Sequence, residues 1–515
     1  MNHSIETIEP GFKRCLDAEE NFMPSPQRLL LIMISLCPLA SLPQAGVGGP
    51  IDNPKYGLVT THGPDSTAGG WMINLGITGI RVRLEPDAPE VLSVGHVFPD
   101  SPASGRLEIG DIITGTGSQM NFSTAHKFGY GMDKFGYEGP LMEFSETLEA
   151  CQGVDGTGRM RIHFIRDGEV KQVMLEIGKA YGNFSKSYPF ECKKTDRILA
   201  ELLPYIAKRQ LENGTWGDRQ HINAFAALAL LASGDERYRD HTRKAARAFA
   251  ARTSDVIDYT NYDCWTHSLY GIYLGEYYLA TREEWVLSEL EEINRWLPRS
   301  QMGNGGWGHR PAERPGGNGY GAINILAMQC KMAWALIERC GLQIDEEGFT
   351  SAHRFAKRGT NALGYVWYAD SLGGDGYADM GRTGAASIAH GLAAERPGYS
   401  EYALRSARCI GANPDTFCDT HGSPILGMGW TALGAAIDQE SFRRMMDENR
   451  WWFSLAQCND GTFYYQPNRD NNPQDYEAAP RLSASAVTAL ILCMKDRKLA
   501  MMNLDVGSSE SASVE

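Results

Sequence analysis

"HINAFAALALLAS", residues 221–233, is apolar around nearly its whole circumference when it is drawn as a helix. The preceding segment, residues 195–211, is different, because its apolar residues recur every three or four positions between charged ones. A helix that is apolar all round is buried, whereas a helix with one apolar face lies at a surface. The two segments therefore predict an inner helix packed against an outer helix.

The same alternation continues along the chain at a period of roughly fifty residues. Six such pairs predict an all-α (α/α)6 toroid over residues 193–500, with an inner ring of helices inside an outer ring. The expected inner helices cover residues 221–233, 264–281, 320–340, 382–394, 422–437 and 482–495, and the expected outer helices cover residues 195–211, 237–252, 283–298, 347–358, 398–410 and 440–457.

The connections differ in length according to their direction. Most links from an inner to an outer helix are short, such as "SGDERY" and "ATREEW", whereas most links from an outer to an inner helix are long and rich in glycine. In a toroid all links of one kind emerge on one face. The long links therefore predict the mouth of the toroid, where we expect function to lie, because long loops on a rigid scaffold often carry it.

Three of the long links share a pattern of glutamine, glycine and an aromatic residue: "RQLENGTWGD" (209–218), "SQMGNGGWGH" (300–309) and "AQCNDGTFYY" (456–465). This pattern resembles the Gln-Trp repeat of terpenoid cyclases and of the prenyltransferase toroid superfamily. The resemblance implies a structural role, in which the glutamine and the aromatic residue tie an outer helix to the loop that follows it.

Residues 55–180 have a different pattern, in which short β-rich runs are bounded by Gly, Pro and Asp. "LMEFSETLEAC" (141–151) is the one helical pattern among them. The expected strands are "GIRVRL" (79–84), "VLSVGHVFP" (91–99), "DIITGTG" (111–117), "RMRIHFIRDG" (159–168) and "VKQVMLEIG" (170–178).

This β-rich region resembles the PDZ family. "NLGITG" matches the loop that binds a peptide carboxylate, with Leu75, Gly76 and Ile77 in its motif, and "VFPDSPASGRLEIGDIITGTG" (97–117) matches the segment after it. The resemblance implies a ligand: the C-terminus of a peptide, added as a strand beside the helix at 141–151. A PDZ-like fold that serves only as a docking module is the alternative.

The N-terminal region predicts export. "RLLLIMISLCPLASLPQAG" (28–46) has a basic residue, a short apolar run and then small residues, as a secretory signal does, and it is too short to span a bilayer stably. We assign residues 1–45 to this signal region, with Met23 as the expected true start. The mature protein is expected to be secreted or periplasmic, or in the cell envelope, without a membrane span. Residues 501–515 are expected to be a disordered tail.

The combination of an exported PDZ-like domain with such a toroid resembles a bacterial family without an assigned activity. The net charge of −14 argues against nucleic acid or an anionic membrane as the main partner. The cysteines after the signal are odd in number and scattered, which is not a disulfide framework.

Two C-x-x-H pairs raise the question of a metal: Cys264 with His267, and Cys418 with His421. They begin the second and fifth inner helices, whose axes lie opposite each other and roughly 16–20 Å apart. Zinc bonds of about 2.0–2.3 Å do not bridge that span. We therefore predict no cofactor and interpret the pairs as buried cysteines and polar helix starts, with zinc as the alternative.

A zinc-dependent, prenyltransferase-like toroid is a second alternative. In prenyltransferases, zinc is held by an Asp-x-Cys on one inner helix and a His on a neighbouring one. "YDCW" departs from that pattern, because Asp263 directly precedes Cys264. The D-x-D-D cluster of squalene-type cyclases and the Gly-Cys-Gly-Glu-Gln motif of complement-like thioester domains are absent from the sequence.

The mouth gathers residues that suit acid–base chemistry and carbohydrate binding. His267 and His421 titrate near neutral pH and fit a general acid or base. "GGDGYADMGRTGA" (373–385) brings polar residues to the start of an inner helix, whose dipole favours anions. The remaining catalytic candidates are Asp263, Asp375, Asp379, Arg382 and Tyr320, and the candidates for ligand binding are Trp367, Tyr377 and Tyr464. Each also fits a loop hydrogen bond or a helix cap.

Two classes of function follow from these patterns. The first is an exported hydrolase or lyase that acts on a glycan or another extended polymer at the mouth, with the PDZ-like domain positioning it. The second is a non-catalytic scaffold that binds a peptide or another ligand. The first predicts histidine and carboxylate side chains that converge in an open cavity, and the second predicts a filled cavity or scattered charges.

Overall fold

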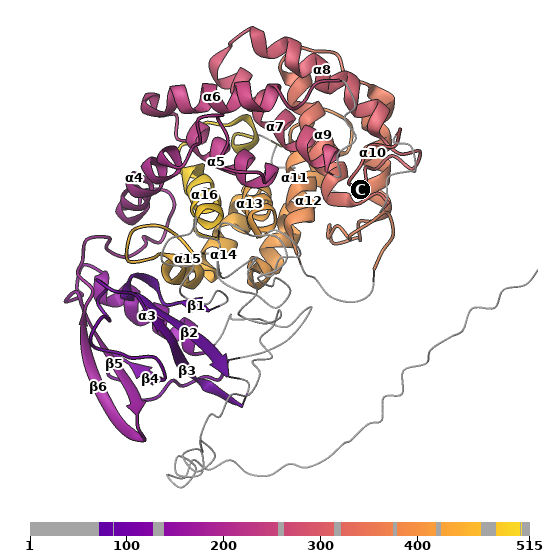
Figure 1. The fold of residues 1–515 in the computed structure, drawn as a ribbon. Coiled ribbons are helices and arrows are strands. Elements are labelled where there is room, and N and C mark those ends of the chain that lie inside the picture. The colour runs from indigo at the N-terminus through magenta and orange to yellow at the C-terminus, as the bar shows by residue number, and fades with distance from the viewer. Residues whose placement is uncertain are drawn as a thin grey trace, which may run out of the picture. The chain divides into compact units, whose positions relative to one another are not determined.

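The computed structural model describes a β-sheet region followed by a helical region (Figure 1). No helix within the described part of the chain combines the length and hydrophobicity that a bilayer crossing requires. The signal region 1–45 lies outside the described residues. These residues are 72–85, 87–126, 139–255, 262–313, 321–373, 379–418, 424–464, 480–504 and 506.

The sheet region is a meander of antiparallel strands in the order β1-β2-β3-β4-β5-β6. Helix α3 packs against β3, β4 and β5, because Leu141, Phe144 and Leu148 form an apolar stripe at helical spacing. The structure thus confirms the prediction that this region is β-rich and contains one helix. The strands are β1 (Ile73–Asn74), β2 (Ile80–Glu85), β3 (Ala88–Val97), β4 (Ile112–Thr116), β5 (Arg159–Arg166) and β6 (Glu169–Glu176), and α3 spans Pro140–Gln152.

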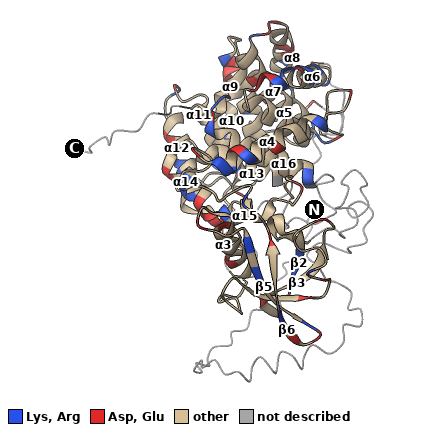
Figure 2. Cartoon of the chain, turned by 90° about the vertical axis from the view of Figure 1, so that its left-hand side faces the viewer, with Lys and Arg blue, Asp and Glu red and all other residues tan. Residues whose placement is uncertain are grey.

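The helical region is the predicted double ring. Within the described residues, six helices form the inner ring: each packs against the next in the order α5, α7, α9, α11, α13 and α16, and α16 packs against α5. Along the chain, the outer helices alternate with the inner helices, and they carry charged residues, as on α6 and α8 (Figure 2). The inner helices are α5 (Gln220–Ala232), α7 (Asp263–Thr281), α9 (Asn324–Arg339), α11 (Gly381–Gly391), α13 (Pro424–Ala435) and α16 (Pro480–Leu492), and the outer helices are α4 (Lys193–Lys208), α6 (Arg239–Ala250), α8 (Trp285–Ser300), α10 (Glu346–Arg358), α12 (Tyr399–Ala412), α14 (Gln439–Glu448) and α15 (Arg450–Ala456).

Side chains occupy the space between inner helices that are not neighbours in the ring. The rings of Phe225 on α5 and Trp430 on α13 meet edge to face, with their centroids 5.0 Å apart. Both residues are fully buried. Because α16 lies between α5 and α13 in the ring, these aromatic side chains fill the interior beside α16.

The first two glutamine–aromatic patterns act as staples, as predicted. Gln210 donates from Nε2 to the carbonyl of Gly214 at 3.0 Å and to that of His241, on the next outer helix, at 2.9 Å. Gln301 repeats this arrangement with Gly305 and with Gly348 on α10, both at 2.9 Å.

The aromatic residues of the same loops complete the staples. Trp216 donates from Nε1 to the carbonyl of Ile206 at 2.7 Å, and Trp307 donates to Ser300 Oγ at 2.9 Å. Gln457, in the third pattern, departs from this scheme. Its side chain is buried and, among the described residues, has no hydrogen-bond partner. Its carbonyl instead accepts from Asn74 of the sheet region at 3.0 Å.

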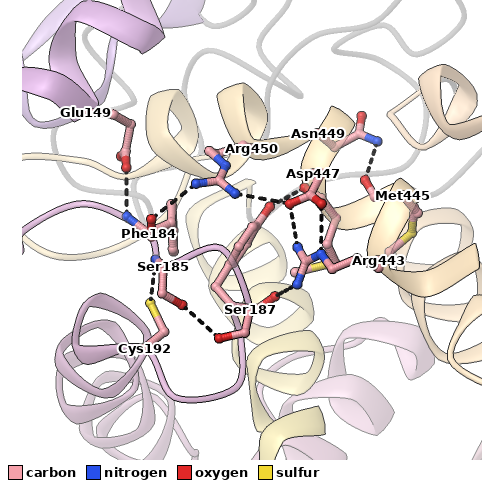
Figure 3. A network of polar contacts seen from close by, with 12 residues as sticks. Glu149, Phe184, Ser185, Ser187, Cys192, Arg443, Met445, Asp447, Asn449 and Arg450 are labelled. Atoms are coloured by element: carbon pink, nitrogen blue, oxygen red, sulfur yellow. Dashed lines mark hydrogen bonds and ion pairs between the residues drawn. The ribbon is translucent and has the colours of Figure 1, made fainter. Parts of the chain in front are cut away.

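A buried carboxylate joins the sheet region to the helical ring. Glu149, on α3, accepts from the backbone N–H of Phe184 at 2.8 Å (Figure 3). It also accepts from Ser454 Oγ of α15 at 2.7 Å. It also forms an ion pair with Lys194 at the start of α4, and both side chains are buried. Glu149 therefore links α3 to the segment between the sheet region and the helical region, to α4 and to α15.

Two arginines hold the connection between the regions against α14 and α15. Arg450 donates to the carbonyl of Phe184 at 3.1 Å and Arg443 donates to the carbonyl of Tyr188 (Figure 3). Asp447 pairs with both arginines, at 2.8 Å and 3.0 Å. The connection is thus a packed part of the structure.

The loop predicted to bind a peptide carboxylate lies at the same joint. Leu75 and Ile77 are buried, and Gly76 adopts a φ of 69° against α15. A Cβ at Gly76 would lie 2.9 Å from the carbonyl oxygen of Ser454, so only glycine allows this approach. The loop that the PDZ resemblance points to is therefore in contact with α15 of the same chain.

The disordered tail was predicted to begin at residue 501, but ordered structure continues past this residue. Residues Ala500–Met502 form a 3-10 helix with Met501 and Met502 buried. Glu276 on α7 is fully buried and accepts from the backbone N–H groups of Ala500 and Met501, at 2.7 and 2.8 Å. The helical region therefore continues past residue 500, because a carboxylate fixes the segment that follows α16.

Glu276 gives the stability of the protein a specific pH dependence. Burial raises the pKa of this carboxyl from 4.5 to about 7. The folded state therefore holds a proton between these values that the unfolded state has lost, so the contribution of Glu276 to stability falls as the pH rises from about 4.5 to 7. The change is about 3 kcal/mol.

We expect Glu276→Gln to remove this dependence, because glutamine does not titrate. Urea unfolding of both proteins at pH 5 and at pH 8 measures it. As the pH rises from 5 to 8, the free energy of unfolding of the wild type should fall by about 3 kcal/mol relative to that of the variant. Parallel pH profiles would contradict the role of Glu276.

Candidate functional site

The N-terminal ends of the inner helices and the long loops before them form the mouth. Of the predicted catalytic and binding residues, four lie outside the described residues: Tyr320, Asp375, Tyr377 and His421. The others are distributed over different parts of the mouth and the joint, as the following contacts show.

His267 does not have the surroundings of a general base at the mouth. It is buried, and its ring stacks on Trp296 of the outer helix α8 with centroids 3.8 Å apart. Nδ1 lies 3.0 Å from the carbonyl oxygen of Asp263, and Nε2 lies 3.2 Å from that of Ser254. Burial lowers the pKa of His267, which keeps the ring neutral. This geometry assigns His267 to the packing of α7 against α8.

Cys264 is also part of the packed interior. Its side chain is fully buried, and burial raises the pKa of the thiol well above its usual value. Among the described residues, no three His, Cys, Asp or Glu side chains form a group that could hold a metal. Cys418 is buried while its partner His421 is outside this part of the chain, so the zinc alternative stays a prediction.

Asp379 and Arg382 lie together, as the 373–385 segment predicted. Arg382 donates from Nη1 to Asp379 Oδ2 at 3.0 Å and from Nη2 to Tyr365 Oη at 3.1 Å. Asp379 also accepts from the backbone N–H of Gly381 at 3.3 Å, at the start of α11. Because both charges are buried and paired, this site holds a helix start in place.

Tyr464 lies where the sheet region reaches the mouth. The guanidinium carbon of Arg81, on β2, is 3.5 Å from the centroid of the Tyr464 ring and 4.8 Å from that of Phe98. Arg481, at the start of α16, lies 5.5 Å from the Phe98 centroid and pairs with Asp460 at 2.8 Å. All except Asp460 are buried. Tyr464 is therefore part of the joint between the sheet region and the start of α16.

Trp367 and Tyr368 remain half-buried on the opposite side of the ring, beside α9. Asn324, at the start of α9, donates from Nδ2 to the carbonyl of Trp367 at 3.0 Å, and its backbone N–H donates to the carbonyl of Tyr368 at 2.8 Å. These bonds fix the backbone of the two aromatic residues, which are partly exposed as residues.

A second aromatic set, on the other side of α9, was not among the predicted site residues. Trp265 donates from Nε1 to Nδ1 of His309 at 2.7 Å. The Tyr262 ring lies edge to face with His309, with centroids 5.8 Å apart, and Tyr262 is 51% exposed. Since Nδ1 accepts, the neutral imidazole carries its proton on Nε2. Burial and the charge of Arg310 lower the pKa of His309, which favours this neutral form.

The sequence contained a signal for this second set. His309 follows Trp307 by two residues in the second staple loop, and Trp265 stands next to Cys264. The C-x-x-H spacing pointed to His267 and not to its neighbour Trp265. Helix α7 turns His267 toward α8 and Trp265 toward His309, and spacing alone does not determine that rotation.

Comparison with known families places the helical region. A family model described as "Domain of unknown function (DUF6288)" matches residues 195–502, which is more than half of the chain. The chain belongs to this family. The DUF6288 match begins within α4 and ends at Met502, and so includes the buried segment that Glu276 holds. No curated protein matches the chain in sequence.

Several solved structures are similar to the DUF6288 region in fold. The GH76A alpha-1,6-mannanase from Salegentibacter sp. HEL1_6 is 14% identical, with 59% of this chain and 99% of that chain covered, at a TM-score of 0.45. A type II terpene cyclase variant from Scytonema is 11% identical, with 58% and 97% covered, at a TM-score of 0.40. At such identities and TM-scores the likeness extends to neither activity nor ligand.

Proposed function

We propose that this DUF6288 protein binds a glycan at the mouth of its helical ring. One observation carries the proposal: Tyr262, Trp265, Trp367 and Tyr368 are partly exposed around the start of α9. Partly exposed aromatic rings offer flat apolar faces beside polar groups, and such surfaces suit the alternating apolar and hydroxyl faces of sugars.

The described residues support binding more strongly than cleavage. Hydrolysis of a glycosidic bond uses two carboxyl groups about 5–10 Å apart on either side of the bond. Asp379 is committed to its ion pair with Arg382, and Asp263 lies beneath the rim at the start of α7, with an exposed fraction of 6%. We therefore assign binding as the primary function and treat hydrolase or lyase activity as an outcome that the same experiment measures.

We further propose that the sheet region is PDZ-like and that the protein is exported. The antiparallel meander with α3, the glycine loop at Gly76 and the N-terminal pattern of residues 28–46 support this interpretation. In this proposal the PDZ-like loop receives α15 of the same chain in place of a foreign peptide. An added peptide ending in a free carboxylate should then bind weakly or not at all.

The test is a binding screen of the purified full chain against alpha-1,6-mannan, dextran, xylan and polygalacturonate, with product analysis in the same samples. We expect at least one polymer to bind, and Trp265→Ala to weaken that binding about thirtyfold or more, since aromatic anchors contribute about 2 kcal/mol or more.

Trp285→Ala is the matched control. Trp285 is also a half-buried tryptophan, but it lies at the start of the outer helix α8, away from the mouth. It should leave binding unchanged. If no polymer binds, the glycan proposal is wrong. If a polymer binds but both variants bind it like the wild type, the aromatic residues around the start of α9 are not the binding site.

A further inference from the structure

Lys331, on α9, is a buried lysine whose amine faces aromatic rings. Its side chain is fully buried, and within the described part of the chain its Nζ has no hydrogen-bond partner. Nζ lies 4.1 Å from the centroid of the Tyr399 ring, at the start of α12, and 4.9 Å from that of the Phe349 ring on α10. Two aromatic faces thus take the place of the hydrogen-bond acceptors that a buried ammonium usually has.

Two histidines lie beside the same Tyr399 ring. His353, on α10, stacks on this ring with centroids 4.5 Å apart, and its Nδ1 lies 2.8 Å from Nε2 of His390 on α11. Nδ1 of His390 lies 2.6 Å from the carbonyl oxygen of Ala386, to which it donates. In the neutral pair, Nε2 of His390 therefore accepts from Nδ1 of His353. His390 is fully buried, and His353 is partly exposed.

The carboxylates beside this cluster pair with an arginine. The guanidinium carbon of Arg396, in the connection before α12, lies 4.4 Å from the centroid of the Phe349 ring. Arg396 forms ion pairs with Glu338 and Glu346 at 2.8 Å and with Glu395 at 3.0 Å. These carboxylates therefore balance the charge of Arg396, and Lys331 is left without an anionic partner among the described residues.

The other groups that act on the two histidines are a lysine and two phenols. Lys357, on α10, is a further cation and lowers the pKa of His353. Burial raises the pKa of Tyr399 and of Tyr402, both on α12, so their hydroxyl groups stay uncharged. Helix α13, which packs against α11, contains no titratable residue. The surroundings thus oppose a second positive charge in the cluster.

From these contacts we propose that Lys331, His353 and His390 form an acid-sensitive latch, which holds α10 and α12 on the inner ring while the three side chains share no more than one positive charge. A proton on both Lys331 and His353 places two like charges against the same Tyr399 ring, in a buried site whose carboxylates pair with Arg396. Separation of α10 and α12 from the ring exposes the three side chains to water, and each of them then takes up a proton.

The pKa values have the directions that this latch requires. Burial lowers the pKa of Lys331 and of His390 well below their usual values. Burial and the charge of Lys331 lower the pKa of His353 to about 3. Opening therefore takes up protons, and it becomes easier as the pH falls below about 6.5, where a free histidine titrates. Glu276 has the opposite effect, because its raised pKa stabilises the folded state in acid.

Opening of the latch also reaches the mouth. Gly359 directly follows the last residue of α10, and its carbonyl accepts from the backbone N–H of Trp367 at 2.7 Å. A shift of α10 therefore moves the loop that carries Trp367, and we expect acid to loosen this part of the mouth.

The experiment is amide hydrogen exchange of the full chain between pH 7.5 and pH 5, with mass spectrometry of peptides from α10 and α12. Division by the intrinsic exchange rate at each pH gives the opening constant. This constant should rise at least about tenfold per pH unit below pH 6.5, since opening takes up one proton or more. Peptides from α6, an outer helix outside the latch, should show a smaller rise. An equal rise in α6, α10 and α12 would mean global unfolding and would overturn the latch.

Two variants and a control assign the effect to the cluster. His353→Asn keeps a donor in place of Nδ1 but does not titrate, so the rise between pH 6.5 and pH 5 should become about tenfold smaller. Lys331→Met removes the neighbouring charge and should shift the onset of opening to a lower pH. His241→Asn is the matched control, because His241 is partly exposed on the outer helix α6 and its Nδ1 lies 2.7 Å from Gln210 Oε1. It should leave the exchange of α10 and α12 unchanged. Wild-type profiles of α10 and α12 in both His353→Asn and Lys331→Met would show that these side chains do not control the opening.

Discussion

Replacement of Glu149 by alanine is expected to lower the free energy of unfolding by about 3–5 kcal/mol, since removal of one partner leaves a buried charge uncompensated. The partner is Lys194, whose side chain is buried with 1% of its surface exposed. The same substitution removes an acceptor from the backbone N–H of Phe184 and from Ser454. The measurement is urea unfolding followed by circular dichroism.

Glu146→Ala is the matched control, because Glu146 is on the same helix and is exposed. It should change stability by no more than about 0.5 kcal/mol. Limited proteolysis adds a structural readout: cleavage between residues 178 and 192 should become faster in Glu149→Ala and stay slow in Glu146→Ala. If both variants unfold at the same urea concentration, the clamp does not join the two regions.

Gly384→Ala is expected to prevent proper closure of the inner ring. The added Cβ would lie 2.0 Å from the carbonyl oxygen of Trp430 on α13, and a Cβ at Gly434 would lie 2.4 Å from the Cα of Gly384. The backbones of α11 and α13 meet at these two glycines, so no side chain can move aside. We expect a loss of at least about 3 kcal/mol, or a protein that is insoluble.

Gly271→Ala on α7 tests whether the crowding causes the effect. A Cβ there would meet only the side-chain carbons of Ala333 and Ile293, at 3.2 and 3.3 Å. Thermal unfolding should place this control near the wild type. Helix propensity alone predicts a gain of about 1 kcal/mol for either substitution. A Gly384→Ala protein as stable as the wild type would refute the proposed close approach.

Wholly apolar segments such as 221–233 were predicted as buried helices, and the structure has α5 there with its residues from His221 to Ala232 buried. This prediction succeeds because periodicity along one helix needs no knowledge of its neighbours. The staples at Gln210 and Gln301 were predictable for a similar reason. Each glutamine bonds to a glycine four residues later in its own loop, which the local pattern reveals, whereas its second partner on the next outer helix lies 31 or 47 residues away.

The candidate site was much less predictable. His267 and Trp265 are two residues apart, and the rotation of α7 alone decides which of them lies beside His309 and which stacks on α8. Arg81 contacts Tyr464 from the other end of the chain, and no pattern of spacing connects residues so distant in sequence.

By itself, then, the sequence determined the inner and outer helices, their order and the face that bears the long loops, because the hydrophobic period of a segment depends only on its own residues. Tertiary structure decided that α15 contacts the loop at Gly76, that Arg81 of the sheet region packs on Tyr464, and that an aromatic set lies on each side of α9. These outcomes depend on helix rotation and on close approach between distant segments, and both are set by packing the whole chain at once.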